Sequence, residues 1–570
     1  MKKLNELFIS IKNTITKNFI SATLNFLFII IFINVFQKLF GAENSIVGVI
    51  FTIMMSASMV RDLTATPVRH FIIQSITLVL MSAAACIVTA VSSGWAFFFN
   101  VMMLFLILYA FTYEYANQLY FPYILSYLFL IFISPVSLEH LPKRMLAMVT
   151  GAVCIIIYQW IRGRKRIVET SQDVLGSMCL KVKTCIQQRL DGVEETYDPE
   201  SLRENLCELS QLIYDRRKKA LCISDASFAM INVGRGLEDL AHLICTLDED
   251  TIRLHLPLFE KILIQIEEFH RFIMHEKKTL SFFVETDFQG IEDTSLKSIA
   301  QSLSYLYEHL LQMTVPDHQH HYRKTMLSLS TRCKAALNVS SVRVIYALRV
   351  SVLLAAATFI VQMLQLPHGK WLLFTLASVS LPYADDIKMK AKKRLIATLI
   401  GGVVGALLYS LLPSLTMRTF IMMLSGYVSY YFTDYSATFA CSTIGALGGA
   451  VFMNAFGWEA VGQILGIRLG YILLGILIGW TANCLVFPYK RKQATKQLWK
   501  KYIRTTELLT QICHVENTDH QLYYNLVIQA HLLENKLLEN AKALNWEGAR
   551  DLMAKCREAV RLAHRQPLSS

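Results

Sequence analysis

Charged residues and catalytic signatures are scarce in this sequence of 570 residues. Only 17% of the residues are Asp, Glu, Lys or Arg and 54% are hydrophobic, which indicates an integral membrane protein with substantial soluble parts. The sequence contains no Walker A loop, no G-x-S-x-G elbow and no H-E-x-x-H helix. These motifs mark ATP-driven motors, serine hydrolases and zinc hydrolases. We therefore expect neither an enzyme nor a bound cofactor.

The cysteine pattern does not suit a protein that is held together by disulfides. The 12 cysteines form no C-x-x-C pair, and several lie inside apolar runs, which indicates small buried side chains in a reducing compartment. The histidine-rich stretch Asp317–His321 has no partner cluster, so we interpret it as a surface loop and expect no metal site. The N-terminus shows no cleavage pattern of small residues, which predicts that no signal peptide is removed.

Two groups of six apolar runs dominate the sequence. The first group covers roughly 18–36, 46–60, 71–92, 95–111, 113–134 and 143–161, and the second covers about 344–366, 370–382, 394–412, 418–433, 435–456 and 461–487. Because about 20 apolar residues cross a bilayer as a helix, we predict an all-α integral membrane protein. It would have about 12 spans in two six-helix transmembrane blocks, 18–161 and 344–487.

The other segments are charged and predict soluble helices. Residues 162–343 carry apolar residues at helical spacing and predict a helical domain. The tail 488–570 is similar and is expected to dock on that domain, whereas residues 1–17 suit an amphipathic surface helix. An even number of spans places both termini and both soluble parts on one side of the membrane, and the basic stretch Arg162–Arg166 indicates that this side is cytoplasmic.

The net charge of +13 does not indicate nucleic-acid binding. The basic residues gather at the ends of apolar runs, and no basic–aromatic stripe occurs, so the expected surface partner is the lipid bilayer.

Three features of the first block return in the second, in the same order and at nearly the same spacing. Arg69 returns as Arg394, Phe111–Tyr115 returns as Phe432–Tyr435, and Arg144 with Gly151 returns as Arg468 with Gly475. Since each block has six predicted spans, we interpret the blocks as parallel repeats.

The second block differs from the first in its glycines. Glycines four residues apart let membrane helices approach closely, so we predict the tightest packing here. The glycines with this spacing include Gly401 and Gly405, Gly445 and Gly449, Gly462, Gly466 and Gly470, and Gly475 and Gly479.

A short apolar segment marks the candidate site. Trp371–Leu381 holds about 11 residues, too few to cross the hydrocarbon core, and leads into Pro382, two acids and the basic cluster Lys388–Arg394. Transporters place binding sites at interrupted helices of this kind.

These residues carry a resemblance to a known family. Trp371, Pro382, Arg394–Gly401 and the series Arg468, Gly475 and Pro488 resemble the fusaric acid resistance (FUSC), or aromatic acid exporter, family. In block two, Ala397 stands where the family usually has glycine, and in block one Arg69 lacks the Thr-x-x-Gly that should follow. The resemblance implies secondary efflux of small, often aromatic, carboxylic acids across the bacterial inner membrane. A similarity to plant aluminium-activated malate channels, which pair one such block per subunit, keeps an anion channel as an alternative.

Five residues are candidates for binding an organic anion. Arg394 and Arg69 stand where a carboxylate would meet a helix start, although both could be headgroup anchors. Arg468 and Arg144 lie within or near spans, where a cation usually faces a cavity or a partner, and Trp371 could stack on an aromatic substrate or mark the membrane edge.

The acids Glu114 and Asp434, flanked by Tyr115 and Tyr435, are candidates for proton coupling if burial raises their pKa values. They could equally be solvated loop residues. The sequence leaves two further partners open, a second copy of the chain in a homo-oligomer and a periplasmic adaptor. A third hypothesis for the function is a membrane-anchored scaffold that acts through the helical domain.

Overall fold

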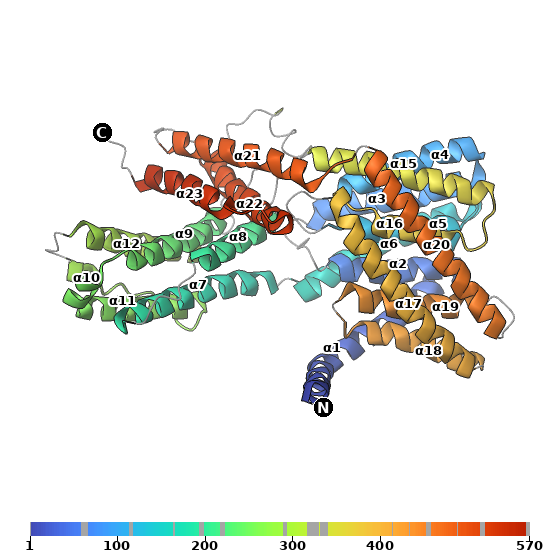
Figure 1. Cartoon of the computed structure of the whole chain (residues 1–570), viewed down its shortest axis with the longest axis horizontal. Coiled ribbons are helices and arrows are strands. Elements are labelled where there is room, and N and C mark those ends of the chain that lie inside the picture. The colour runs from blue at the N-terminus through green and yellow to red at the C-terminus, as the bar shows by residue number, and fades with distance from the viewer. Residues whose placement is uncertain are drawn as a thin grey trace.

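The computed structural model of the chain describes residues 2–58, 67–112, 118–163, 166–192, 199–216, 223–288, 293–315, 330, 340–412, 414–432, 434–451, 458–486, 488–513 and 519–565. In these ranges all regular elements are helices and no strand occurs. The helices form a membrane body and a soluble body that lie side by side (Figure 1).

The membrane body contains both apolar blocks. The first block is α1 (Lys2–Phe40), α2 (Ser45–Ser58), α3 (Pro67–Ala90), α4 (Ser93–Phe111), α5 (Tyr120–Phe132) and α6 (Leu141–Gly163). The second is α15 (Ser341–Met363), α16 (Lys370–Val379), α17 (Ile387–Leu411), α18 (Leu415–Ser429), α19 (Tyr435–Val451) and α20 (Trp458–Leu485).

Seven helices in the described part of the chain are long and apolar enough to cross a membrane, namely α1, α3, α4, α6, α15, α17 and α20. Three shorter apolar helices are Ala42–Ser58, α5 and α16. The predicted all-α membrane class is therefore confirmed, whereas the count of about 12 spans stays a prediction.

The two blocks use similar helix pairings. In the first block α3 contacts α4, α5 and α6, and in the second α17 contacts α18, α19 and α20. The blocks join where α15 packs along α4, and α15 and α16 share one apolar core with the first block. The parallel repeat, which these pairings fit, remains a prediction.

Two helix starts differ from the sequence-based expectation. The chain runs as one helix from Lys2 to Phe40, rather than as a separate segment 1–17 and a span from 18, because no glycine or proline interrupts it. Likewise, α17 begins at Ile387, so Arg394 lies inside the helix and does not open it. The lysines before Arg394 are good helix formers and extend α17 toward the corner.

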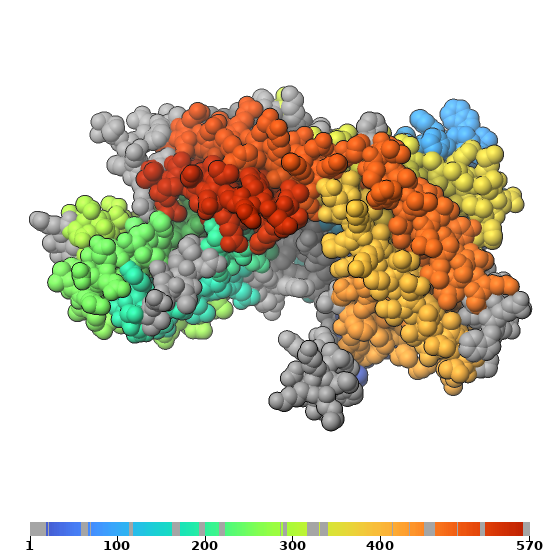
Figure 2. Space-filling model, in the orientation of Figure 1, coloured from blue at the N-terminus to red at the C-terminus, as the bar shows by residue number. Residues whose placement is uncertain are grey.

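The soluble body combines the insert with the tail. The insert is α7 (Arg166–Leu190), α8 (Pro199–Arg216), α9 (Asp225–Cys245), α10 (Glu249–Leu254), α11 (Leu256–Ile273) and α12 (Thr294–Thr314), and the tail is α21 (Arg491–Ile512), α22 (His520–Leu544) and α23 (Ala549–Arg565). One hydrophobic core draws side chains from α7, α8, α9, α11, α12, α21 and α22. The tail thus docks on the insert as predicted, and its helices lie along one side of the insert in Figure 2.

Some of the predicted glycines lie where helices touch. A Cβ added at Gly401 would meet the Ala440 carbonyl oxygen of α19 at 2.3 Å, and one at Gly475 would meet Thr375 of α16 at 3.0 Å. Gly405 and Gly445 also have neighbours, at 3.2 Å. By contrast, Gly449, Gly462, Gly466 and Gly470 have no such neighbour within 4 Å among the described residues, so nothing there requires glycine for close packing.

Candidate anion site

The short helix α16 ends inside the protein. It has 10 residues, about 15 Å of helix, and its last carbonyl groups need donors away from water. Tyr346 of α15 donates its hydroxyl hydrogen to the Ser380 carbonyl at 3.0 Å, and Arg349 donates to the Leu381 carbonyl at 2.7 Å. Side chains of α15 therefore hold the end of the half-length helix in place.

The acidic corner after α16 is bound to the start of the tail. Arg491 donates two hydrogen bonds to the Asp386 carboxylate, at 2.6 and 2.5 Å. The Arg491 amide donates to Asp385 at 2.9 Å, and the Ala384 amide donates to the Tyr489 carbonyl at 3.1 Å. Both acids of the corner thus fasten α17 to α21.

Arg394 is buried among aromatic rings of α19. Its guanidinium carbon lies 4.2 Å from the centre of the Phe439 ring, and the Tyr435 hydroxyl lies beside it and beside Ser378. The Arg394 Nε and the Tyr435 oxygen have no hydrogen-bond partner of good geometry among the described residues. Arg394 therefore keeps unused donor capacity in a largely apolar pocket.

Arg468 lies close to Arg394 and is equally buried, at 6% exposure for each. Its guanidinium carbon is 5.0 Å from the centre of the Trp371 ring, and His368 stacks on the same ring at 4.8 Å. Arg468 Nε and Nη1 lack hydrogen-bond partners within the described part of the chain. The two guanidinium groups are near enough to repel each other.

No described acid forms an ion pair with Arg394 or Arg468. Two buried cations without a counter-charge are costly, because the effective penalty for burying an ion is several kcal/mol. A cation in a membrane span normally faces a cavity or a partner. A carboxylate between these arginines would accept hydrogen bonds from unused donors and remove the repulsion, so the arrangement suits an organic anion.

Arg144 stands apart from this pair. Its Nε donates to Asn44 at 2.5 Å, its Nη1 donates to the Ser134 carbonyl at 3.0 Å, and its Nη2 donates to the Glu43 carbonyl at 2.9 Å. With its donors engaged and 1% exposure, Arg144 ties two loops together, which is a structural role. Arg69 is the third residue of α3, and its side chain lies outside the described residues.

Of the proton-coupling candidates, Asp434 and Tyr435 are described. Asp434 caps α19 by accepting hydrogen bonds from the amides of Ser436 at 2.8 Å and Ala437 at 3.4 Å. Chiefly the Ser436 amide, and more weakly Lys393, hold the pKa of the Asp434 carboxyl below its usual range. Glu114, Tyr115 and the stretch Asp317–His321 lie outside the described residues, and no cluster suited to a metal ion occurs among the described ones.

Several residues of the site were not predicted. Phe439 could have been found, because it follows Tyr435 by four residues and so lies on the same helix face. His368, Ser378, Tyr346 and Arg349 gave no signal, since they act through contacts between helices that periodicity does not reveal.

Comparison with known proteins supports the resemblance in the second block. Residues 354–482 match the family described as fusaric acid resistance protein-like. The inner membrane protein YccS of Escherichia coli K12 is 25% identical over 146 residues, which are 25% of this chain and 20% of YccS. A Haemophilus influenzae protein is 28% identical over 143 residues, 25% of this chain and 20% of that protein. The ORF2 protein of Neisseria gonorrhoeae is 28% identical over 155 residues, 27% of this chain and 36% of that protein.

The chain therefore aligns with about a fifth to a third of the length of these relatives. No solved structure matches it. The family resemblance is confirmed where the candidate site lies.

Proposed function

We infer, from the match of residues 354–482 to the fusaric acid resistance protein-like family, that this membrane protein exports small organic anions from the bacterial cytoplasm. Aromatic carboxylic acids are the proposed substrates. The observation that carries the proposal is the pair Arg394 and Arg468, both buried, surrounded by aromatic rings and without an acidic partner among the described residues.

The proposed path follows the two arginines. A substrate carboxylate enters beside the corner 385–394 and meets Arg394, whose planar guanidinium binds a carboxylate through two hydrogen bonds. The apolar body of the substrate lies beside the α19 rings that surround Arg394, those of Tyr435 and Phe439. Arg468 then competes for the same carboxylate, and a second site of the same charge weakens the hold of the first, which favours onward movement.

The proposed energy source is the membrane potential, because the substrate carries a negative charge. The soluble body and both termini are proposed to be cytoplasmic, and the cytoplasm is the negative side of the membrane. Moving one negative charge outward gains about 2.3 kcal/mol per 100 mV. Among the described residues, no carboxylate forms an ion pair with Arg394 or Arg468, and the candidate Asp434 lies 3.8 Å from Lys393 instead. Export driven by the membrane potential, by a carrier or by a channel, is therefore favoured over proton coupling at this site.

The test is cytoplasmic accumulation of a panel of aromatic carboxylates in cells with wild-type protein, Arg394→Ala, Lys388→Gln or no protein. Lys388 belongs to the same helix and basic cluster but is exposed, so it controls for charge alone. We expect wild type and Lys388→Gln to lower accumulation, and Arg394→Ala to lose the effect at equal expression. Equal accumulation in all strains would refute the proposal. A phenotype that survives Arg394→Ala but needs residues 167–341 would indicate the scaffold instead.

A further inference from the structure

The soluble body contains a cavity of about 490 Å³ between the insert and the tail. Its walls come from α8, α9 and α12 on the insert side and from α21, α22 and α23 on the tail side. This volume falls in the range of pockets that hold small molecules. The cavity lies in the soluble body, away from the arginine pair of the membrane body (Figure 1).

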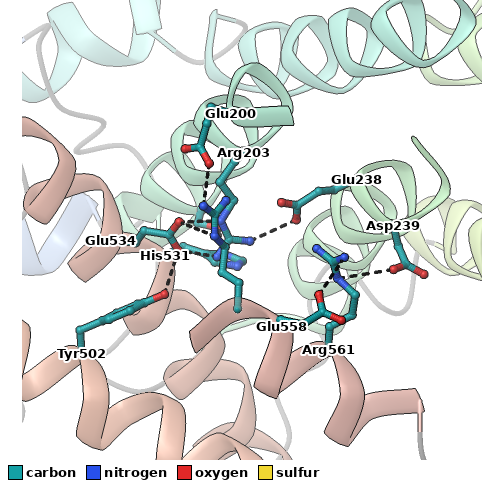
Figure 3. Close-up of polar contacts among 11 residues, drawn as sticks. Glu200, Arg203, Glu238, Asp239, Tyr502, His531, Glu534, Glu558 and Arg561 are labelled. Atoms are coloured by element: carbon teal, nitrogen blue, oxygen red, sulfur yellow. Dashed lines mark hydrogen bonds and ion pairs between the residues drawn. The ribbon is translucent and has the colours of Figure 1, made fainter. Parts of the chain in front are cut away.

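Ion pairs between the insert and the tail build the cavity wall (Figure 3). Arg203 of α8 donates to both oxygens of Glu534 of α22, at 3.1 and 2.6 Å, and also contacts Glu238 at 3.1 Å. Arg557 of α23 pairs with Glu200 at 2.6 Å. Because these arginines have acidic partners, they hold the tail on the insert and leave little charge for a ligand.

Arg235 is different from the other arginines of the cavity. It lines the cavity from α9, and its hydrogen bond is to the neutral Tyr523 hydroxyl at 3.2 Å. No described acid forms an ion pair with it. Burial also lowers the pKa of His531, which lines the same cavity, well below its ordinary value, so that side chain is neutral. Among the described residues that line the cavity, Arg235 is therefore the arginine without an acidic ion-pair partner.

The remaining wall is mixed. Leu509, Val527 and Val560 line it together with the rings of Tyr305 and Tyr502. The acids Glu238 and Asp239 also line it, and they pair with Arg203 and Arg561. A small molecule with one anionic group and an apolar body would match both the unpaired Arg235 and the apolar side chains of this wall.

One helix connects the cavity with the membrane site. Tyr502, Thr506 and Leu509 of α21 line the cavity, whereas Arg491, the first residue of α21, binds Asp386 just before α17. Arg491 and Tyr502 lie about 17 Å apart along the helix axis. A ligand that draws α9 and α21 together therefore acts on the corner that positions Arg394.

We propose that this cavity binds a small organic anion from the cytoplasm, with Arg235 as its charge partner, and that α21 transmits binding to the Arg491–Asp386 pair. The site is separate from the arginine pair of the membrane body and does not depend on transport. Binding in the cavity would couple the conformation of the membrane site to the cytoplasmic concentration of the anion.

The experiment measures hydrogen exchange of the full-length purified protein with benzoate or its neutral analogue benzamide, in an Arg394→Gln, Arg468→Gln background that lacks the membrane site. We expect benzoate, and not benzamide, to slow exchange in α9 and α21. Arg235→Gln should raise the benzoate concentration needed for half-maximal protection at least tenfold. Arg253→Gln, which changes an exposed arginine of α10, should leave that concentration unchanged.

Two further variants keep the proposal falsifiable if Arg235→Gln does not fold. Gln301→Trp places a bulky ring at the exposed edge of the cavity and should abolish protection without touching an ion pair. In Arg491→Gln, benzoate should still slow hydrogen exchange in α9 but should no longer alter the exchange of residues 384–394. Protection that is absent with benzoate, or unchanged in both Arg235→Gln and Gln301→Trp, overturns the proposal, whatever the transport assays show.

Discussion

The guanidinium of Arg468 lies over the indole ring of Trp371, 5.0 Å from its centre. His368 stacks on the same ring, nearly parallel to it at 13°. A ring already covered in this way holds Arg468 in place through a cation–π contact and offers little free face to a substrate. We therefore assign Trp371 to positioning Arg468 rather than to stacking on the substrate.

Trp371→Leu separates these two roles. If Trp371 positions Arg468, transport of aliphatic and aromatic carboxylates should fall together, several-fold, and Trp371→Phe should restore part of both. If the ring stacks on the substrate, transport of the aromatic compounds alone should fall. The measurement is competition between benzoate and an aliphatic carboxylate in cells that express each variant.

Arg144 should behave as a structural residue. Arg144→Met leaves Asn44 and the carbonyls of Glu43 and Ser134 without their donor, and a buried acceptor without a partner costs about 1–3 kcal/mol. We expect a lower melting temperature in detergent but an unchanged order of substrate preference per folded molecule. A changed preference at unchanged stability would instead place Arg144 on the substrate path.

The glycines of the second block provide a matched pair. Gly401→Ala must separate α17 from α19, because its Cβ would lie 2.3 Å from a backbone oxygen, and overpacking of this kind costs about 1–3 kcal/mol. Gly466→Ala meets open space and should leave stability unchanged or slightly raised. Thermal unfolding of both variants checks this, and equal melting temperatures would contradict the packing assigned to Gly401.

Asp434 should act as a helix cap and not as a proton carrier. Since its folded pKa is lowered, its contribution to stability is present above the ordinary value of 3.8 and is lost as the pH falls through the lower folded value. Between pH 5 and 8 it stays ionised. Asp434→Asn should therefore leave the pH profile of transport unchanged in that range, while Asp434→Ala lowers the melting temperature through loss of the cap. A shifted pH profile in Asp434→Asn would instead support proton coupling through Asp434.

The sequence predicts the parts of this fold that depend on local pattern. Apolar runs located the long membrane helices, and the short run at Trp371 located α16, because bilayer thickness sets helix length. The family motif identified Arg394 and Arg468. What the pattern could not show is that α15, through Tyr346 and Arg349, fixes the end of α16, because such contacts join helices that are distant in the sequence.

For the same reason, the sequence did not reveal that the buried arginines Arg144 and Arg468 have different roles. The predicted repeat pairs Arg144 with Arg468, because each is followed by a glycine seven residues later. Only the loops around Arg144 supply it with carbonyl partners, whereas Arg468 faces Trp371 and Arg394. Similarly, the cavity beside Arg235 arises where insert and tail meet, and no local pattern marks it.

The central claim is that Arg394 and Arg468 together carry an organic anion. The most direct test is benzoate uptake into proteoliposomes under an imposed membrane potential, positive inside, for wild type, Arg394→Gln, Arg468→Gln and the control Lys388→Gln. We predict potential-dependent benzoate uptake in wild type and Lys388→Gln, at least a tenfold loss in each of the other two variants, and no specific uptake of benzamide. Uptake that is equal in wild type, Arg394→Gln and Arg468→Gln would contradict the account.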